Sequence, residues 1–292
     1  MALGSAQFGL PYGVTNPHGQ VARAEVGRIL AAAWNGGIEW IDTASAYGSS
    51  ESVLGTELGL PGAPPWRTIT KTAALRKEAI DASDMAAVAS AFATSLTLLG
   101  TERVDALLVH HAQDLLVPGG EALYEWLCVQ KQSGRAGRIG ASVYDSTQTS
   151  RLLERFALDV VQLPASLADQ RMLQDGTVAA LRQAGVEVHV RSLYLQGLLL
   201  AEPAFVAARF PQQSQWAAAL RAECKRVGLS PVEACISFFR SQTAFCTAVI
   251  GATCVAEVDA LVAAWSTAPA MDWSTWAVPD IAFVDPREWK AP

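Results

Sequence analysis

The sequence predicts an α/β protein folded as a (β/α)₈ TIM barrel, and two observations support this prediction. Eight short apolar, β-prone runs alternate along the 292 residues with segments whose apolar side chains recur at helical spacing. Such strict alternation is typical of parallel strands connected by helices. No linker, low-complexity tract or change of pattern divides the chain. We therefore expect one barrel domain over residues 1–292, with its functional site at the C-terminal ends of the strands.

The expected strands are short runs rich in Val, Ile, Leu and Thr. In chain order they are residues 1–6, 38–41, 66–71, 104–111, 138–141, 160–163, 186–191 and 248–250. The Gly- and Pro-rich residues 7–20 after the first run are expected to be a loop. The Trp- and Pro-rich tail from residue 269 is expected to pack against the barrel.

The expected helices follow the strands one by one. They are residues 23–34, 50–58, 84–99, 120–131, 147–156, 174–183, 215–227 with 231–241, and 255–264. In the first of them, Val26, Ile29 and Leu30 fall on one helical face, and Gly36 follows its end. Gly100 ends the helix at 84–99 in the same way.

Composition limits the classes of partner. Hydrophobic residues make up 51% and charged residues 17%, which favours a substantial core over disorder. The net charge of −6 argues against a nucleic-acid partner. We find no run that we expect to cross a membrane and no signal-peptide pattern, and the five cysteines follow no disulfide or zinc spacing. These features predict a cytoplasmic protein with reduced thiols.

Three consecutive expected strands end in chemically active side chains. The second runs into Asp42 with Tyr47 just beyond it, the third ends at Lys71, and the fourth ends at His110 and His111. A nearby ammonium favours the phenolate form of a tyrosine, and a carboxylate paired with the lysine keeps that ammonium in place. Such a phenol can act as a general acid or base. Each residue could also be structural, as a buried ion pair, a rim aromatic or a core histidine.

The segments DTASAYG at Asp42, TK at Lys71 and DALLVH ending at His110 resemble those of the aldo-keto reductase family. The resemblance implies a catalytic tetrad of Asp42, Tyr47, Lys71 and His110, and a reduction of an aldehyde or ketone to an alcohol, or the reverse. In this tetrad Tyr47 is the general acid or base, Lys71 lowers its pKa, Asp42 orients Lys71, and His110 orients the carbonyl. The family usually has a hairpin before the first barrel strand. Because this chain starts too late to contain one, we expect the N-terminal barrel mouth to be open or covered otherwise.

The resemblance also implies a nicotinamide dinucleotide cofactor, NADPH or NADH. Ser142 and Gln162 match residues that grip its carboxamide, although Val143 replaces a usual Asn. Arg191 stands where a Tyr usually stacks on the nicotinamide, and its planar guanidinium can also stack. The remaining expected cofactor contacts are Ser192, Gln196, Gly197, Gly251, Thr253 and Glu257.

The choice between the two cofactors stays open at this point. Family members that prefer NADPH place basic side chains near the adenosine ribose, whereas this chain has Thr253 and Glu257 there. A carboxylate repels a 2′-phosphate and accepts hydrogen bonds from a ribose diol. The family favours NADPH and these local residues favour NADH.

The substrate is expected to be a small carbonyl or alcohol compound, contacted by Phe8, Tyr12 and His111. We expect a monomer or weak oligomer, with no membrane partner and no bound metal. A non-catalytic nucleotide-binding subunit on the same scaffold is an alternative function. A metal site at His110 and His111 is a weaker one, because it lacks a clear third ligand.

Overall fold

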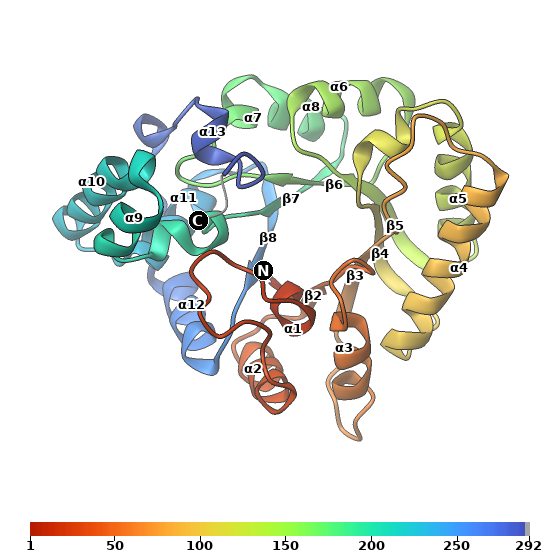
Figure 1. The fold of residues 1–292 in the computed structure, drawn as a ribbon, viewed down its shortest axis with the longest axis horizontal. Helices are drawn as coiled ribbons and strands as arrows, with labels where there is room; N and C mark the ends of the chain where they lie inside the picture. Colours follow the sequence, from red (N-terminus) through yellow and green to blue (C-terminus); the bar gives the residue numbers. More distant parts are fainter. Residues whose placement is uncertain (290–292) are drawn as a thin grey trace.

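The computed structural model describes residues 1–289 and contains a closed barrel of eight parallel strands surrounded by helices (Figure 1). This architecture confirms the (β/α)₈ prediction. Each strand pairs with the next in chain order, and β8 closes the barrel by pairing with β1. The strands are β1 Ala2–Gly4, β2 Trp40–Asp42, β3 Arg67–Lys71, β4 Val104–Val109, β5 Ala136–Ser142, β6 Val160–Pro164, β7 Glu187–Arg191 and β8 Phe245–Gly251.

Most of the helices form the outer ring of the barrel, whereas the short α1, Ala6–Gly9, lies near the centre of this view (Figure 1). The others are α2 Arg23–Asn35, α3 Ser50–Leu58, α4 Ala82–Leu99, α5 Gly120–Gln132, α6 Ser146–Arg155, α7 Arg171–Gln174, α8 Thr177–Gln183, α9 Pro203–Arg209, α10 Pro211–Val227, α11 Pro231–Ser241, α12 Val255–Thr267 and α13 Ile281–Val284. Three 3₁₀ helices also occur, η1 Ala112–Leu115, η2 Leu195–Leu200 and η3 Ser274–Trp276.

The differences from the sequence prediction have local causes. The first strand ends at Gly4, two residues earlier than expected, because the chain turns into α1 at Ala6 and continues as a helix into the expected loop. The expected helix at 174–183 begins only at Thr177 as α8, because Gly176 before it has a φ of 86°, and a separate short helix, α7, ends at Gln174. The sequence prediction also missed α9.

The N-terminal mouth of the barrel is filled by side chains from the strands themselves. The Trp40 ring lies 5.3 Å from the Arg67 guanidinium and 5.7 Å from that of Arg138. Arg138 in turn pairs with Glu187 at 3.3 Å. Above this layer, the buried side chains of Ile69, Ala106, Leu108 and Val160 form the barrel's interior core, against which Trp40 packs. A layer of cationic and aromatic side chains therefore lies at this mouth. The sequence analysis left two alternatives, an open mouth or one covered by something other than a hairpin, and the structure agrees with the second.

Helix α4 corrects one expectation from composition. Its 18 residues have a mean hydropathy of 1.3, so by length and composition alone this helix could cross a membrane. In the structure α4 is one of the outer helices of the barrel, and the side chains of Val88, Phe92 and Leu96 are buried in the core. A capping box between Asp81 and Asp84 begins the helix.

The C-terminal tail packs against the barrel, as expected. The Trp273 indole donates to Ser237 of α11 at 2.9 Å, and the Val278 amide donates to the Ala168 carbonyl at 2.8 Å. Residues 290–292 lie outside the described part of the chain, so a single domain over residues 1–292 stays a prediction.

Candidate active site

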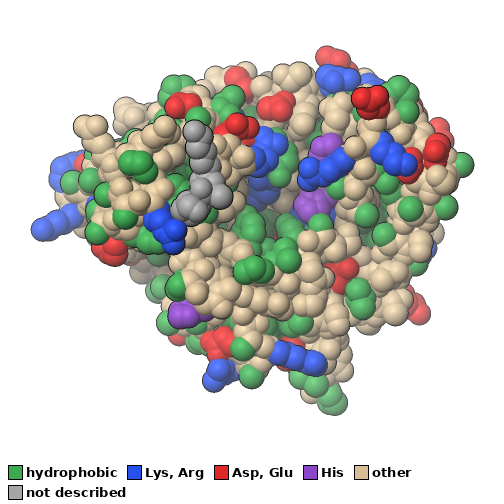
Figure 2. All heavy atoms as spheres, in the orientation of Figure 1, with side chains coloured by type: hydrophobic (Ala, Val, Ile, Leu, Met, Phe, Trp, Pro, Cys, Tyr) green, Lys and Arg blue, Asp and Glu red, His purple; other side chains and the backbone are tan. Residues whose placement is uncertain are grey.

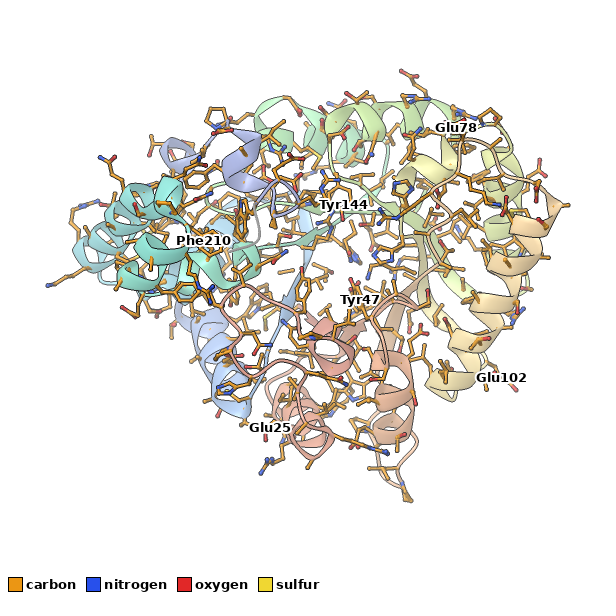
Figure 3. The ribbon with its side chains drawn as sticks, viewed as in Figure 1. Glu25, Tyr47, Glu78, Glu102, Tyr144 and Phe210 are labelled. Atoms are coloured by element: carbon orange, nitrogen blue, oxygen red, sulfur yellow. The ribbon has the colours of Figure 1, made fainter. Side chains whose placement is uncertain are left out.

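The four residues of the expected tetrad come together at the C-terminal ends of β2, β3 and β4. Asp42 and Lys71 are the last residues of β2 and β3, and His110 follows β4 directly. Tyr47 lies in the turn before α3, and Figure 3 places it at the centre of the barrel mouth. Two glycines hold this turn close to α1. A Cβ on Gly9 would lie 1.8 Å from the Tyr47 carbonyl oxygen, and one on Gly48 would lie 2.3 Å from the Gly9 oxygen.

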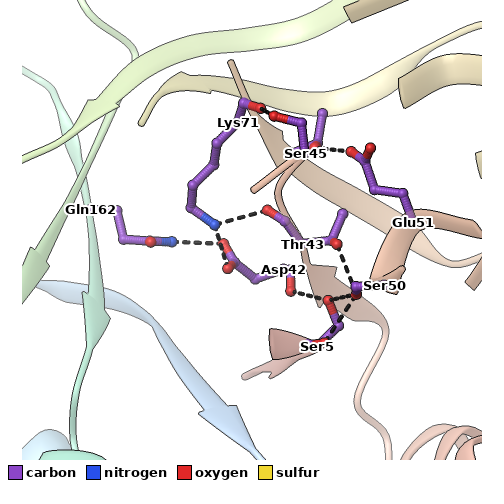
Figure 4. Close-up of polar contacts among 9 residues, drawn as sticks. Ser5, Asp42, Thr43, Ser45, Ser50, Glu51, Lys71 and Gln162 are labelled. Atoms are coloured by element: carbon purple, nitrogen blue, oxygen red, sulfur yellow. Dashed lines mark hydrogen bonds and ion pairs between the residues drawn. The ribbon is translucent and has the colours of Figure 1, made fainter. Parts of the chain in front are cut away.

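A buried ion pair forms the base of the site (Figure 4). Lys71 Nζ lies 2.5 Å from Asp42 Oδ1 and donates to the Thr43 carbonyl at 2.9 Å. Gln162 donates to the other carboxylate oxygen of Asp42 at 2.7 Å. Lys71 and Asp42 are each only 2% exposed. Because both ions are paired and hydrogen-bonded, their burial is compensated and their geometry is fixed.

Tyr47 lies between this ion pair and His110. Lys71 Nζ is 5.1 Å from the centroid of the Tyr47 ring. The rings of Tyr47 and His110 meet edge to face, with centroids 5.8 Å apart and planes at 86°. The Tyr47 ring therefore lies close to both a cation and an imidazole, so the four residues of the expected tetrad are grouped in space.

The protonation states differ in one respect from the sequence prediction. Burial raises the pKa of the Tyr47 phenol, and this effect outweighs the lowering by Lys71 and Arg191. Lys71 does lower the pKa of Tyr47, as expected from the sequence. The sequence analysis did not include burial, which raises this pKa by more. Burial would lower the pKa of Lys71, but Asp42 and Tyr47 raise it further, so the ammonium stays charged. At neutral pH the phenol carries its proton beside this ammonium.

His110 is neutral at physiological pH. Burial, reinforced by the positive charge of Lys71, lowers its pKa from 6.5 to about 4. Its Nδ1 is buried and has no hydrogen-bond partner among the described residues. Leaving a lone pair unpartnered costs less than leaving an N–H unpartnered, so we assign the proton to Nε2. His110 can therefore donate one hydrogen bond from Nε2 without carrying a charge.

A cavity of about 900 Å³ opens beside Tyr47 and runs between the ends of β1, β6, β7 and β8. Figure 2 shows a hollow in this face, bordered by cationic and histidine side chains on one side and hydrophobic side chains on the other. Most of the residues expected to bind the cofactor line the cavity. They are Gln162, Arg191, Ser192, Gln196, Gly197, Gly251, Thr253 and Glu257.

Two loops meet over this cavity. Residues 10–20, here called the strap loop, follow α1 and contribute Tyr12, Thr15 and other residues to the cavity wall. The opposite loop has a left-handed backbone at Ser192, Gln196 and Gly197, with φ values of 63°, 54° and 93°. A Cβ on Gly197 would lie 2.0 Å from Thr15 Oγ1, so glycine is needed where the two loops touch.

Arg191 lies at the end of β7 and lines the cavity. Its guanidinium donates to the Val143 carbonyl at 2.9 Å and stacks on the Tyr144 ring, 4.2 Å from the centroid. Arg287 of the C-terminal tail lies 3.6 Å from the centroid of the same ring. Tyr144 thus covers one face of the Arg191 guanidinium. A nicotinamide ring could stack only on the opposite face of this planar group.

Three expected contacts, Phe8, His111 and Ser142, do not line the cavity, and a fourth, Gly251, lines it beside another side chain. Phe8 is fully buried within α1, so it cannot contact a substrate. Neither histidine is part of the cavity wall, but His110 packs against Tyr47, which lines it, whereas His111 bonds Asp114 at 2.8 Å. Ser142 is buried at the end of β5, beside Gln162. Gly251 lies on the wall, but the Gln7 carboxamide fills the space beside it, 2.5 Å from where a Cβ would stand.

The structure adds residues that the sequence prediction missed. Glu25 and Arg28 of α2 line the cavity, as does much of the strap loop. No local motif marks these residues, because α2 meets α12 only through closure of the barrel. In the described part of the chain, His, Cys, Asp and Glu side chains form no cluster of three or more that could hold a metal.

Comparison with known proteins gives consistent matches. A sequence model described as "Aldo/keto reductase family" matches residues 1–277. A curated Mycobacterium protein named aldo-keto reductase is 30% identical over 139 residues, which are 47% of this chain and 46% of that protein. The chain thus matches about half the length of this relative.

Solved structures are similar in fold. A Bacillus halodurans aldo-keto reductase, in its holo form, has 20% identity and a TM-score of 0.75, covering 93% of this chain and 88% of that one. A Pseudomonas aeruginosa structure titled as an aldo-keto reductase has 23% identity and a TM-score of 0.67, covering 91% of this chain and 89% of that one.

Proposed function

Because the chain belongs to the aldo-keto reductase family, we propose that it is an NAD(P)H-dependent oxidoreductase that reduces an aldehyde or ketone to an alcohol, or catalyses the reverse reaction. The observation that carries the proposal is the position of Tyr47. Its phenol keeps its proton, contacts Lys71 and His110, and lines the cavity. A half-buried proton donor at the wall of a large cavity suits the protonation of a carbonyl oxygen.

The proposed roles follow from the charges of the four side chains. Tyr47 donates its proton to the carbonyl oxygen as negative charge develops there, and the Lys71 ammonium stabilises the phenolate that remains. Asp42 keeps Lys71 charged and in place. His110 donates from Nε2 to the same carbonyl oxygen and orients it. When bound, the nicotinamide cofactor supplies the hydride.

The cavity fits an extended dinucleotide in the chemistry of its walls. Gln162 and Arg191, beside Tyr47 on the wall, would hold the nicotinamide end. Residues Ser192, Gln196 and Gly197 would hold the pyrophosphate, since a left-handed backbone turns successive amides toward one side. Thr253 and Glu257 would hold the adenosine end. Gln162 bonds Asp42 here, so a carboxamide ligand would share its side chain with the ion pair.

Replacement of Tyr47 by Phe tests this proposal. The change removes the proton donor and keeps the ring, so turnover of a generic aldehyde should fall by a factor of about 10²–10⁴. Cofactor affinity, measured by quenching of tryptophan fluorescence, should change by no more than about twofold, because the hydroxyl is assigned to the carbonyl and not to the nucleotide.

Different failures of this test have different meanings. A wild-type protein that binds either nucleotide but turns over no aldehyde or alcohol would indicate a non-catalytic nucleotide-binding subunit. Full activity in Tyr47→Phe would show that another group supplies the proton. A wild-type protein that binds neither NADH nor NADPH would refute the proposal altogether.

A further inference from the structure

One end of the cavity lies at the first turn of α12. Thr253, Cys254 and Glu257 of this region line it together with Glu25 and Arg28 of α2. Figure 3 shows Glu25 on α2, well away from Tyr47 at the barrel mouth. A dinucleotide whose reactive ring lies beside Tyr47 would extend along the cavity and place its other end here. The amides at a helix N-terminus usually favour an anion such as a phosphate.

In this protein, carboxylates already occupy that helix start. The Val255 amide, the first of α12, donates to Glu25 Oε1 at 3.2 Å. Glu257 accepts from both the amide and the hydroxyl of Thr253, at 2.6 and 3.1 Å. The two carboxylates come from different helices and reach the same turn. The Val255 and Thr253 amides, which could otherwise donate to a phosphate, therefore already donate to carboxylates.

Arg28 reduces this negative charge but does not cancel it. Its guanidinium pairs with Glu25 one helical turn away, and its side chain is 69% exposed. A solvent-exposed pair of this kind is weak, and its guanidinium is committed to Glu25. Two carboxylates thus face one already paired guanidinium at this end of the cavity.

We propose that Glu25 and Glu257 make the protein select NADH over NADPH, an inference that rests on the proposed function. The two cofactors differ only at the adenosine ribose, where NADPH carries a 2′-phosphate and NADH a hydroxyl. A phosphate monoester has a charge of about −1.5 to −2 at pH 7 and would be placed beside two carboxylates. A ribose diol instead donates hydrogen bonds to them. Glu25, contributed by α2, is a specificity residue that the motif around Glu257 does not include.

Dissociation constants of both cofactors, measured by quenching of tryptophan fluorescence, test the proposal without any turnover. The wild-type protein should bind NADH at least about 10-fold more tightly than NADPH, which is the size of effect expected for charges several ångströms apart near a protein surface. Glu25→Gln and Glu257→Gln keep a carbonyl acceptor for the Val255 and Thr253 amides and remove the charge. Each single variant should reduce the ratio of the NADPH dissociation constant to the NADH dissociation constant, chiefly by lowering the NADPH constant. The double variant should reduce this ratio most.

Glu223→Gln is the matched control. Glu223 pairs with Arg226 on α10 in the same i,i+3 spacing and does not line the cavity. This change should leave both dissociation constants as they are in the wild type. If it altered the ratio of the two constants as much as Glu257→Gln does, net charge and not the position of the carboxylate would determine the preference, and the proposal would fail.

Two further results would overturn the inference. Equal or tighter binding of NADPH by the wild type would refute it directly. If Arg28→Gln weakened the binding of NADPH but not of NADH, Arg28 would bind the 2′-phosphate. This result would contradict its assignment as a partner of Glu25 only. If the wild-type protein bound NADH and NADPH tightly and equally, only the proposed selectivity would be refuted. If it bound neither nucleotide, the proposed function would be refuted as well.

Discussion

Tyr47 is subject to two opposed effects at the scale of a single residue. The nearby Lys71 ammonium favours the phenolate, while burial favours the neutral phenol, and burial has the larger effect on its pKa. A carbonyl reduction needs the protonated phenol before the reaction and a stabilised phenolate after it. The site provides both, because the protonated state is set by burial and the cation is already in place beside the ring.

The pH dependence of kcat/KM for reduction should show two limbs. It should stay level through neutral pH and fall only above pH 10, the ordinary value for Tyr, as the phenol of raised pKa loses its proton. It should also fall as pH decreases through about 4, where His110 becomes charged. Initial rates over this range, in buffers of constant ionic strength, measure both limbs. An alkaline limb between pH 7 and 8 would contradict the assigned state of Tyr47.

His110 also links stability to pH. Its pKa is about 4 in the folded protein and 6.5 ordinarily, so between these values the unfolded chain binds more protons. This group therefore lowers the free energy of unfolding as pH decreases from about 6.5 to about 4. Loss of activity at the acid limb should be checked against unfolding by circular dichroism.

At the scale of the elements, two loops line the cavity and contact each other. The strap loop and the loop at Ser192 to Gly197 touch where Thr15 packs on Gly197. The left-handed backbone at Gly197 allows this contact, because any other residue would bring a Cβ into Thr15. Loops placed over a rigid barrel in this way can open without disturbing the strands beneath.

Gly197→Ala should displace the strap loop and weaken nucleotide binding by about 10-fold, since the new Cβ would clash with Thr15 where the φ is already strained for an L residue. Fluorescence titration measures this effect. Gly228→Ala is the control, because Gly228 at the end of α10 has a φ of 73° and open space around its missing Cβ. Similar losses of affinity in both variants would mean that backbone strain, and not the loop contact, is responsible.

At the scale of the whole molecule, barrel closure brings remote residues together at both ends. At the C-terminal end it joins Asp42, Lys71 and His110 from three strands, and Gln162 from a fourth. At the N-terminal end it stacks Trp40 against Arg67 and Arg138. The candidate active site and the Trp40 layer thus lie at opposite ends of the barrel, with the interior core between them. TIM barrels usually have their active site at the C-terminal end and residues important for stability at the N-terminal end.

Trp40→Ala should lower the free energy of unfolding by roughly 3 kcal/mol, because it removes a large ring packed on the interior core and two cation–π contacts. Urea unfolding measures this change. Val129→Ala, an exposed position on α5, should cost less than about 0.5 kcal/mol. Nucleotide affinity should be kept in folded Trp40→Ala protein. A stability loss no larger than that of the control would show that the layer does not support the barrel.

The sequence by itself determined the barrel and the composition of the candidate site. Strand and helix alternation is a local property, and so is the occurrence of Asp42, Lys71 and His110 at strand ends, since a parallel barrel brings all such ends to one face. Helices α3 and α11 have the expected bounds, and α11 begins at a local capping box between Ser230 and Glu233.

Only the tertiary structure decided the remaining features. The burial of Phe8, the engagement of His111 by Asp114 and the raised pKa of Tyr47 depend on what packs around each side chain. The contact of Glu25 with Val255 joins residues 230 positions apart. Local sequence patterns fix how each segment folds, but burial, electrostatics and long-range contacts arise only when the closed barrel places distant segments side by side.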